Sequence, residues 1–152
     1  MPSRAEPDEH AVIDEISRLV LTIAGHMQRR FAETVSQHGL SPAQARLLRR
    51  LEPGEAVPMR ELARRLTCDP SNLTDPVDKL EARGALERRP HASDRRVKAI
   101  ALTPDGVRMR DEFWNELLRE ALPGGDLPHA RALELRDRLR EALGADAPPP
   151  AI

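Results

Sequence analysis

A cationic β-hairpin that follows two short helices is the most specific structural pattern in this sequence. Residues 86–89 and 97–102 have the composition of strands, and turn residues occupy positions 90–93 between them. Within residues 83–98 only Glu87 and Asp94 are acidic, and the cations are Arg83, Arg88, Arg89, Arg95, Arg96 and Lys98. Charges at this density do not fill a core. The pattern therefore predicts an outward-pointing β-wing that can meet the phosphate oxygens of DNA.

The positive charge of the chain is concentrated in its middle. The net charge is only −1, but residues 41–103 carry 13 basic and 9 acidic side chains, a local charge of +4. Residues 1–40 carry −2 and residues 104–152 carry −3. This distribution favours double-stranded DNA as the partner, and ordinary solvated surface charge is the alternative. One Trp, two Phe and no Tyr are too few for a base-stacking platform that binds single strands.

Helical periodicity and helix-capping residues dominate the rest of the chain. Apolar side chains recur at three- and four-residue steps between residues 12 and 31, which predicts a long amphipathic helix that ends at Gly39. Ser41-Pro42, with Gln44 three residues after Ser41, is a capping box that opens a second helix. Further helices are expected from about 59 to 67, from Asp69-Pro70 to Gly84, from Thr103-Pro104 to about 122, and from about 128 to 143. Residues 56–58 fit an edge strand or an extended link.

These elements describe a mainly α-helical chain with a small β-wing, folded as one continuous domain of 152 residues. We expect a winged helix-turn-helix region at 41–103, dimerisation helices within 1–40 and 104–145, and a flexible tail at 146–152. The first, fifth and last helices offer more apolar surface than a monomer of this length can easily cover, so a homodimer is expected. A monomer that folds these helices onto its own core is the alternative.

Four segments between residues 59 and 106 form a distinctive series of motifs. They are Glu61-Leu62-Ala63-Arg64-Arg65-Leu66, Ser71-Asn72-Leu73-Thr74, Asp78-Lys79-Leu80-Glu81-Ala82-Arg83-Gly84, and Asp94-Arg95-Arg96 through Gly106, of which the last is the most specific. With the flanking helices, they resemble the MarR family of bacterial transcription regulators. That resemblance implies a repressor that binds a pseudo-palindromic operator as a homodimer. It also implies release by a small-molecule effector or an oxidant.

The resemblance assigns DNA contacts to the fourth helix and to the wing. Ser71, Asn72 and Thr74 take recognition-helix positions, although simple helix capping is the alternative for them. The other DNA-binding positions that we expect are Asp75, Lys79, Arg83, Arg88, Arg89, His91, Arg95 and Arg96. Solvated strand surface is the alternative for Arg88 and Arg89. Asp94 is expected to pair with a neighbouring arginine and to hold the hairpin in shape.

Pro76 departs from the family pattern, which has an ordinary apolar or small residue at this place. A proline inside a helix removes the N–H that would bond the carbonyl of Asn72 and clashes with that carbonyl, at a cost of about 3 kcal/mol. Two outcomes are open: a kinked first turn that redirects Ser71 to Thr74, or a helix that begins at Asp75-Pro76. A winged-helix protein-interaction module with weakened DNA binding is therefore the rival function.

The remaining features limit other functions. A ligand pocket, if present, is expected between the first helix and the DNA-binding lobe, lined by Ile23, His26, Met27, Arg30, Leu47 and Leu51, although core packing explains most of these equally well. The single cysteine, Cys68, is expected to be a small core residue and suits a reducing, cytoplasmic location. No metal-ligand spacing, phosphate-binding glycine loop or catalytic triad is present. We expect no cofactor, no enzymatic activity and no membrane segment.

Overall fold

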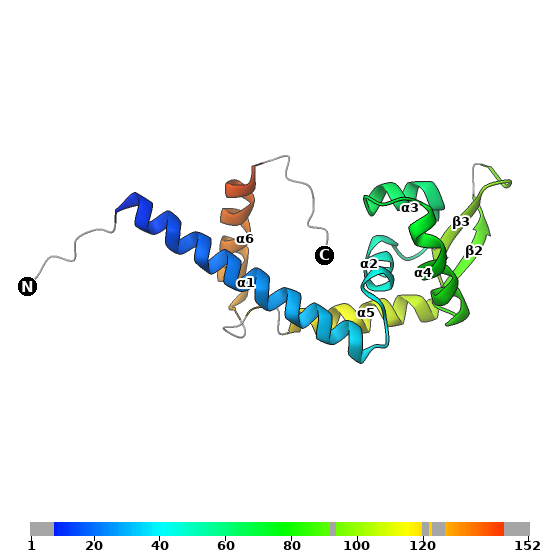
Figure 1. Cartoon of the computed structure of the whole chain (residues 1–152), viewed down its shortest axis with the longest axis horizontal. Coiled ribbons are helices and arrows are strands. Elements are labelled where there is room, and N and C mark those ends of the chain that lie inside the picture. The colour runs from blue at the N-terminus through cyan, green and yellow to red at the C-terminus, as the bar shows by residue number, and fades with distance from the viewer. Residues whose placement is uncertain (1–7, 92–93, 120–121, 123–126, 145–152) are drawn as a thin grey trace, which may run out of the picture.

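Helix α1 (Glu9–Gln37) and helix α5 (Pro104–Arg119) are far apart in the sequence but contact each other along the base of the molecule in Figure 1. The computed structural model describes residues 8–91, 94–119, 122 and 127–144. The other helices and strands are α2 (Pro42–Arg50), β1 (Ala56–Pro58), α3 (Met59–Arg65), α4 (Ser71–Ala82), β2 (Leu86–Pro90), β3 (Lys98–Leu102) and α6 (His129–Leu143). Helices α2, α3 and α4 and the sheet form a lobe at one end, and the first half of α1 and helix α6 lie toward the other (Figure 1).

The hydrophobic core lies almost entirely in this lobe. It joins α2, α3, α4, the sheet and the inner face of α5; its fully buried members include Leu47, Leu48, Leu51, Val57, Leu62, Val77, Leu80, Ile100 and Phe113. Phe113 connects the lobe to α1, because its ring meets the rings of Phe31 and His38 edge-on, with centroids 6.0 and 5.6 Å away. Of the 29 residues of α1, only Thr34 and Val35 are buried. The mainly α-helical winged-helix fold that the sequence predicts is confirmed.

The three strands form an antiparallel sheet in the order β1-β3-β2. Ala56 faces Ala101 on one side of β3, and Leu86 faces Leu102 on the other. The central position of β3 explains why Ala99, Ile100, Ala101 and Leu102 are all buried and why this strand lacks a polar face. Residues 56–58 are an edge strand, one of the two alternatives that the sequence left open.

Most predicted helix ends are confirmed by their hydrogen bonds. Gly39 and Gly84 both have positive φ, at 59° and 72°, and each ends its helix as a left-handed residue. The capping box is present, because the Ser41 hydroxyl accepts from the N–H of Gln44 at 3.2 Å and the Gln44 side chain accepts from the N–H of Ser41 at 2.7 Å. Thr103 caps α5 by accepting from the N–H of Gly106 at 3.0 Å.

The connection between α3 and α4 differs from the prediction. Helix α3 ends at Arg65 rather than near residue 67, and Thr67 takes the left-handed conformation with φ 51°. Helix α4 has no side-chain cap at its start. Instead the N–H of Asn72 bonds the Asp69 carbonyl at 3.0 Å, so the first turn is tight and 3₁₀-like. The helix that the sequence predicts to open at Asp69-Pro70 therefore begins at Ser71.

Pro76 lies inside a continuous helix. Helix α4 begins at Ser71, five residues before the proline, and the proline ring is buried. The alternative in which the helix begins at Asp75 is therefore wrong. Helix α5 is described up to Arg119, and residues 120–121, next to its predicted end at about residue 122, lie outside the described residues. Residues 123–126 and the predicted tail 146–152 also lie outside the described residues.

Candidate nucleic-acid interface

Helix α4 divides into a buried face and an exposed polar face. Leu73, Pro76, Val77 and Leu80 are buried against the core. On the other face Ser71, Asn72 and Thr74 are exposed. This arrangement leaves the small polar residues of the helix accessible to a ligand, as a recognition helix requires. DNA contact by these residues stays a prediction.

Asp75 and Lys79 also lie on the exposed side of α4 and form an ion pair. The Lys79 ammonium and the Asp75 carboxylate are 2.9 Å apart at i, i+4 spacing, and both side chains are more than half exposed. Surface pairs of this kind contribute at most about 1 kcal/mol. Lys79 is therefore able to leave Asp75 for a phosphate with little loss of stability.

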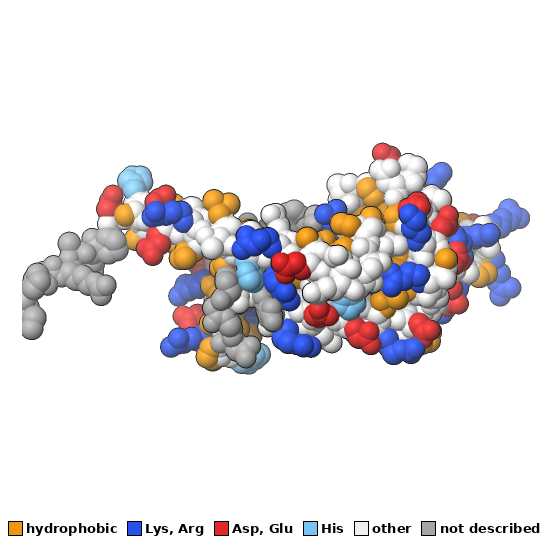
Figure 2. Space-filling view, turned by 60° about the horizontal axis from the view of Figure 1, so that its bottom comes forward, with side chains coloured by type: hydrophobic (Ala, Val, Ile, Leu, Met, Phe, Trp, Pro, Cys, Tyr) orange, Lys and Arg blue, Asp and Glu red, His pale blue; other side chains and the backbone are white. Residues whose placement is uncertain are grey.

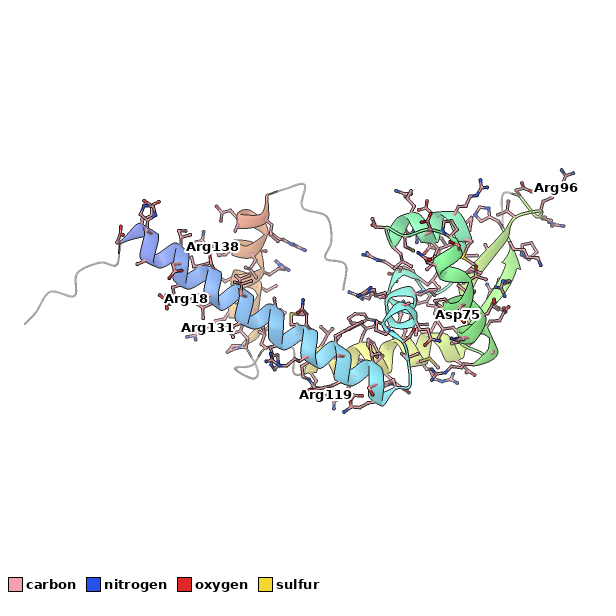
Figure 3. The ribbon with its side chains drawn as sticks, viewed as in Figure 1. Arg18, Asp75, Arg96, Arg119, Arg131 and Arg138 are labelled. Atoms are coloured by element: carbon pink, nitrogen blue, oxygen red, sulfur yellow. The ribbon has the colours of Figure 1, made fainter. Side chains whose placement is uncertain are left out.

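The wing carries two arginines at its end. Figure 3 shows Arg96 at the far end of the hairpin, pointing away from the rest of the subunit. Arg95 and Arg96 are both exposed, and within the described part of the chain neither side chain forms an ion pair. In Figure 2 basic side chains project at this end of the molecule. Two exposed guanidinium groups on a projecting hairpin suit the minor groove or the phosphate backbone of a duplex.

Asp94 shapes the hairpin through the backbone. Its carboxylate accepts a hydrogen bond from the N–H of Arg96 at 2.9 Å, and its carbonyl accepts from the N–H of Val97 at 3.0 Å. The N–H of His91, which is half-buried, then donates to the Val97 carbonyl at 2.8 Å. The contact expected for Asp94 was with an arginine side chain, whereas the bond that forms involves an arginine backbone. The geometry supports the hairpin-shaping role.

Three of the predicted DNA-binding arginines engage the protein itself. Arg83 donates to the carbonyls of Gly39 and His38 at 2.9 and 3.2 Å, which ties the end of α4 to the end of α1. Arg88 pairs with Asp78 and Glu81 of α4, and Arg89 pairs with Glu87 on its own strand. Since these guanidinium groups already have acceptors, their contact with DNA remains a prediction that the geometry favours less than contact by Arg95 and Arg96.

An ion-pair network at the entry to the helix-turn-helix was not predicted from the sequence. Arg65 donates to Glu55 at 2.7 Å and to Glu61 at 3.1 Å. Hydrogen bonds from Arg64 and then Arg65 lower the pKa of Glu61 to about 2, and the hydrogen bond from Arg65 lowers the pKa of Glu55. Glu55 in turn raises the pKa of Arg65 further above its ordinary value. The network fixes α3 against the loop that precedes β1.

The residues predicted to line a ligand pocket fall into two groups. Ile23, His26, Met27 and Arg30 are half-buried along one side of α1. Leu47 and Leu51, in contrast, are fully enclosed in the core. A ligand could therefore reach the α1 group without rearrangement but not the two leucines. The pocket as a whole stays a prediction.

The single cysteine lies at the edge of the core. Cys68 is half-buried and packs against the core cluster. Across the described residues, no group of three or more His, Cys, Asp or Glu side chains could hold a metal ion. The helices in the described ranges include none that is long and apolar enough to cross a bilayer.

A helix with an exposed polar face, followed directly by a hairpin with two exposed arginines at its end, defines a winged helix-turn-helix protein. Residues 40–98 match the model of the MarR family. Through this segment the chain is similar to the MarR family.

Relatives and solved structures agree with this assignment. The chain is 31% identical over 80 residues to the HTH-type transcriptional repressor MdtR of Bacillus subtilis, a match that covers 53% of this chain and 52% of MdtR. The chain thus spans about half to two thirds of the curated relatives that it matches. The YusO protein of Bacillus subtilis has the same fold, with a TM-score of 0.72 at 22% identity over 91% of this chain and 99% of YusO. CouR of Rhodococcus jostii RHA1, solved bound to p-coumaroyl-CoA, has a TM-score of 0.64 at 29% identity and covers 89% of this chain and 96% of CouR.

Proposed function

We propose that this protein is a sequence-specific, DNA-binding transcription regulator that binds a pseudo-palindromic operator as a homodimer. The observation that carries the proposal is that two wing arginines, Arg95 and Arg96, and the polar face of α4 are all exposed. A duplex offers phosphates to the wing and base edges to the helix at the same time. The protein is a regulator and not an enzyme.

The homodimer is supported by apolar side chains that the subunit leaves uncovered. Helix α1 exposes Ile13, Ile16, Leu19 and Val20, and α6 exposes Leu133, Leu135, Leu139 and Leu143. Helix α6 has no buried residue at all. Figure 2 displays hydrophobic side chains along this end of the molecule. A second copy that covers both helices would bury these side chains and place two recognition helices on successive turns of the duplex, about 34 Å apart.

Repression and effector release are the finer parts of the proposal. MdtR is a transcriptional repressor and CouR binds p-coumaroyl-CoA, so we propose that this chain represses transcription and responds to a small-molecule effector. The half-buried side of α1 around Ile23, His26 and Met27 is the proposed contact surface. Because the proposed partner is DNA, the proposed location is the cytoplasm.

The test is a selection of duplexes from a random-sequence pool, followed by binding measurements at increasing salt. The proposal expects an enriched inverted repeat with half-sites about 10 base pairs apart. It also expects affinity to fall steeply with ionic strength. A pool that yields no repeat and binds without salt dependence would reject the proposal.

The rival function, a winged-helix module that binds another protein, rests on Pro76. This residue leaves the Asn72 carbonyl without its helical donor in the half of α4 that would enter the groove. Replacing it (Pro76→Leu) is expected to change operator preference while leaving dimer stability nearly unaltered. If Pro76→Leu creates duplex binding that the natural chain lacks, the interaction module is the better description.

A further inference from the structure

Arg88 joins the wing to the recognition helix. One nitrogen of its guanidinium lies 2.5 Å from the Asp78 carboxylate, and another contacts the Glu81 carboxylate. Asp78 and Glu81 are one helical turn apart on α4, so a single planar fork holds both. We propose that Arg88 is a positioning residue, which sets the angle of the wing relative to α4 and does not itself contact DNA. The inference rests on the proposed DNA-binding function.

The place of Arg88 in β2 makes it suited to this role. Along the strand, Leu86 is buried, Glu87 and Arg88 are half-buried, and Arg89 and Pro90 are exposed. Arg88 is therefore the last side chain of β2 that touches the body of the subunit before the hairpin projects. Its backbone faces Ile100, a buried residue of the central strand. Beyond this point the hairpin leads to Arg95 and Arg96, so a small change of angle at Arg88 becomes a larger displacement of the arginines at the end.

The neighbouring arginine shows the contrast. Arg89 pairs with Glu87, two residues away, at 2.6 Å. Both residues belong to β2, so this pair does not join the strand to another element. Arg88, in contrast, has a side chain only 29% exposed and crosses from β2 to α4. Of these two arginines, only Arg88 can transmit the orientation of the helix to the hairpin.

The pairing also changes the charge on the DNA-facing helix. Asp78 and Glu81 would repel phosphates if they were left alone. Arg88 offsets one of these two negative charges, and its own positive charge is then no longer available to a phosphate. A positioning role therefore makes an unusual prediction: the two carboxylates help DNA binding although their charge opposes it.

This prediction gives a test whose sign separates the two roles. Mutating Arg88 itself does not separate a DNA contact from a positioning role, because both roles predict weaker binding. The double variant Asp78→Asn with Glu81→Gln separates them, because the two roles predict opposite changes in affinity. If Arg88 contacts DNA, removing two negative charges frees its guanidinium and tightens binding. If Arg88 positions the wing, the same variant releases the hairpin so that the wing no longer engages the duplex, and affinity falls about tenfold at physiological salt.

A matched control uses the carboxylate that does not reach α4. Glu87→Gln removes a negative charge from the same strand, so binding is expected to stay equal or become tighter. Thermal unfolding of both variants checks that they fold. Amide hydrogen exchange in the absence of DNA should then be faster at Arg89, His91 and Val97 in the double variant than in the natural chain, with exchange of Leu47 and Leu48 unchanged.

The outcomes are distinct. Weaker binding with faster exchange confined to the hairpin supports the positioning role. Equal or tighter binding by the Asp78→Asn, Glu81→Gln variant overturns it while leaving the proposed function intact. Unchanged exchange in the hairpin also overturns it. A natural chain that binds no duplex rejects the proposed function itself.

Discussion

Gly106 approaches the backbone of Ala85 so closely that no side chain fits between them. A Cβ atom on Gly106 would lie 1.9 Å from the Ala85 carbonyl oxygen. The same carbonyl accepts from the N–H of Thr103 at 3.1 Å, and the Thr103 hydroxyl donates to the carbonyl of Gly84. The start of α5 is thereby fixed to the turn that joins α4 to β2. This arrangement connects the helix that packs on α1 to the DNA-binding lobe.

Replacing Gly106 by alanine should therefore destabilise the protein strongly. The Ala85 carbonyl oxygen belongs to the backbone and cannot rotate away from the new Cβ atom. We therefore expect the free energy of unfolding to fall by about 3 kcal/mol or more, at the upper end of the range for overpacked sites. Urea unfolding measures the change. In Gly25→Ala the new Cβ meets only the Arg29 side chain at 3.8 Å, and this control should gain about 0.5–1 kcal/mol. Equal stability of the two variants would contradict the close approach of the two backbones.

Thr67 is the position where a substitution should stabilise the chain. It is a β-branched residue with φ 51°, and a left-handed conformation costs such residues about 1–2 kcal/mol. Thr67→Gly removes this strain, less the entropy that glycine loses on folding, for a net gain on the order of 0.5 kcal/mol. Thermal unfolding should detect the gain. The control Thr22→Gly, in the middle of α1, should instead lower the stability, because glycine inside a helix is unfavourable.

Acid stability depends on the Arg65 network. The pKa values of Glu55 and Glu61 both lie below the ordinary glutamate value of 4.5, and that of Glu61 is about 2. Carboxylates with lowered pKa values stabilise the fold fully above the unfolded pKa, and this stabilisation is lost as pH falls toward the folded pKa. The window is thus about pH 4.5 to 2.

Arg65→Met should therefore lower stability at neutral pH and weaken its dependence on pH inside this window. Urea midpoints at about pH 7, 4 and 3 provide the measurement. Arg18→Met is the control, because Arg18 pairs with Asp14 on the exposed face of α1. The assignment is wrong if Arg65→Met loses stability across the acid part of this range as steeply as the natural chain does.

Dimerisation should be sensitive to charge on one face of α1. Ile16→Glu with Leu19→Glu is expected to yield monomers of 17.0 kDa in sedimentation equilibrium and to weaken operator binding, because burying two carboxylates in an apolar interface is costly. Leu21 is exposed as well, but it lies about 140° around the helix from Ile16. Leu21→Glu should therefore remain dimeric. Monomeric behaviour of the natural chain would contradict the proposed dimer.

Local signals in the sequence were sufficient for most of the fold. Gly39, Gly84, Ser41 and Thr103 end or begin helices as predicted because capping depends on a few adjacent residues. The start of α4 was less predictable. Its first turn is closed by the carbonyl of Asp69 and not by the Asp69 side chain, and the sequence does not distinguish the two.

The partners of the arginines were beyond prediction for a different reason. Arg83 reaches Gly39 from 44 positions away in the chain, and Arg88 reaches Asp78 from ten positions away. Such pairs depend on how the elements pack, and several acidic residues were equally plausible partners. The sequence therefore placed five arginines in one DNA-binding group. The structure separates Arg83, Arg88 and Arg89, which are held by the protein, from Arg95 and Arg96 at the end of the wing.

The salt dependence of operator binding tests the role of this wing most directly. Fluorescence anisotropy with a labelled operator, repeated from low to high salt, gives the slope of log affinity against log salt. Arg95→Ala with Arg96→Ala should weaken binding and make the slope shallower by about 0.9 for each phosphate that the wing no longer neutralises. Arg131→Ala with Arg138→Ala removes the same charge from α6, far from the wing (Figure 3), and should leave the slope unchanged. An unchanged slope for the wing variant would contradict a DNA-binding role for the wing.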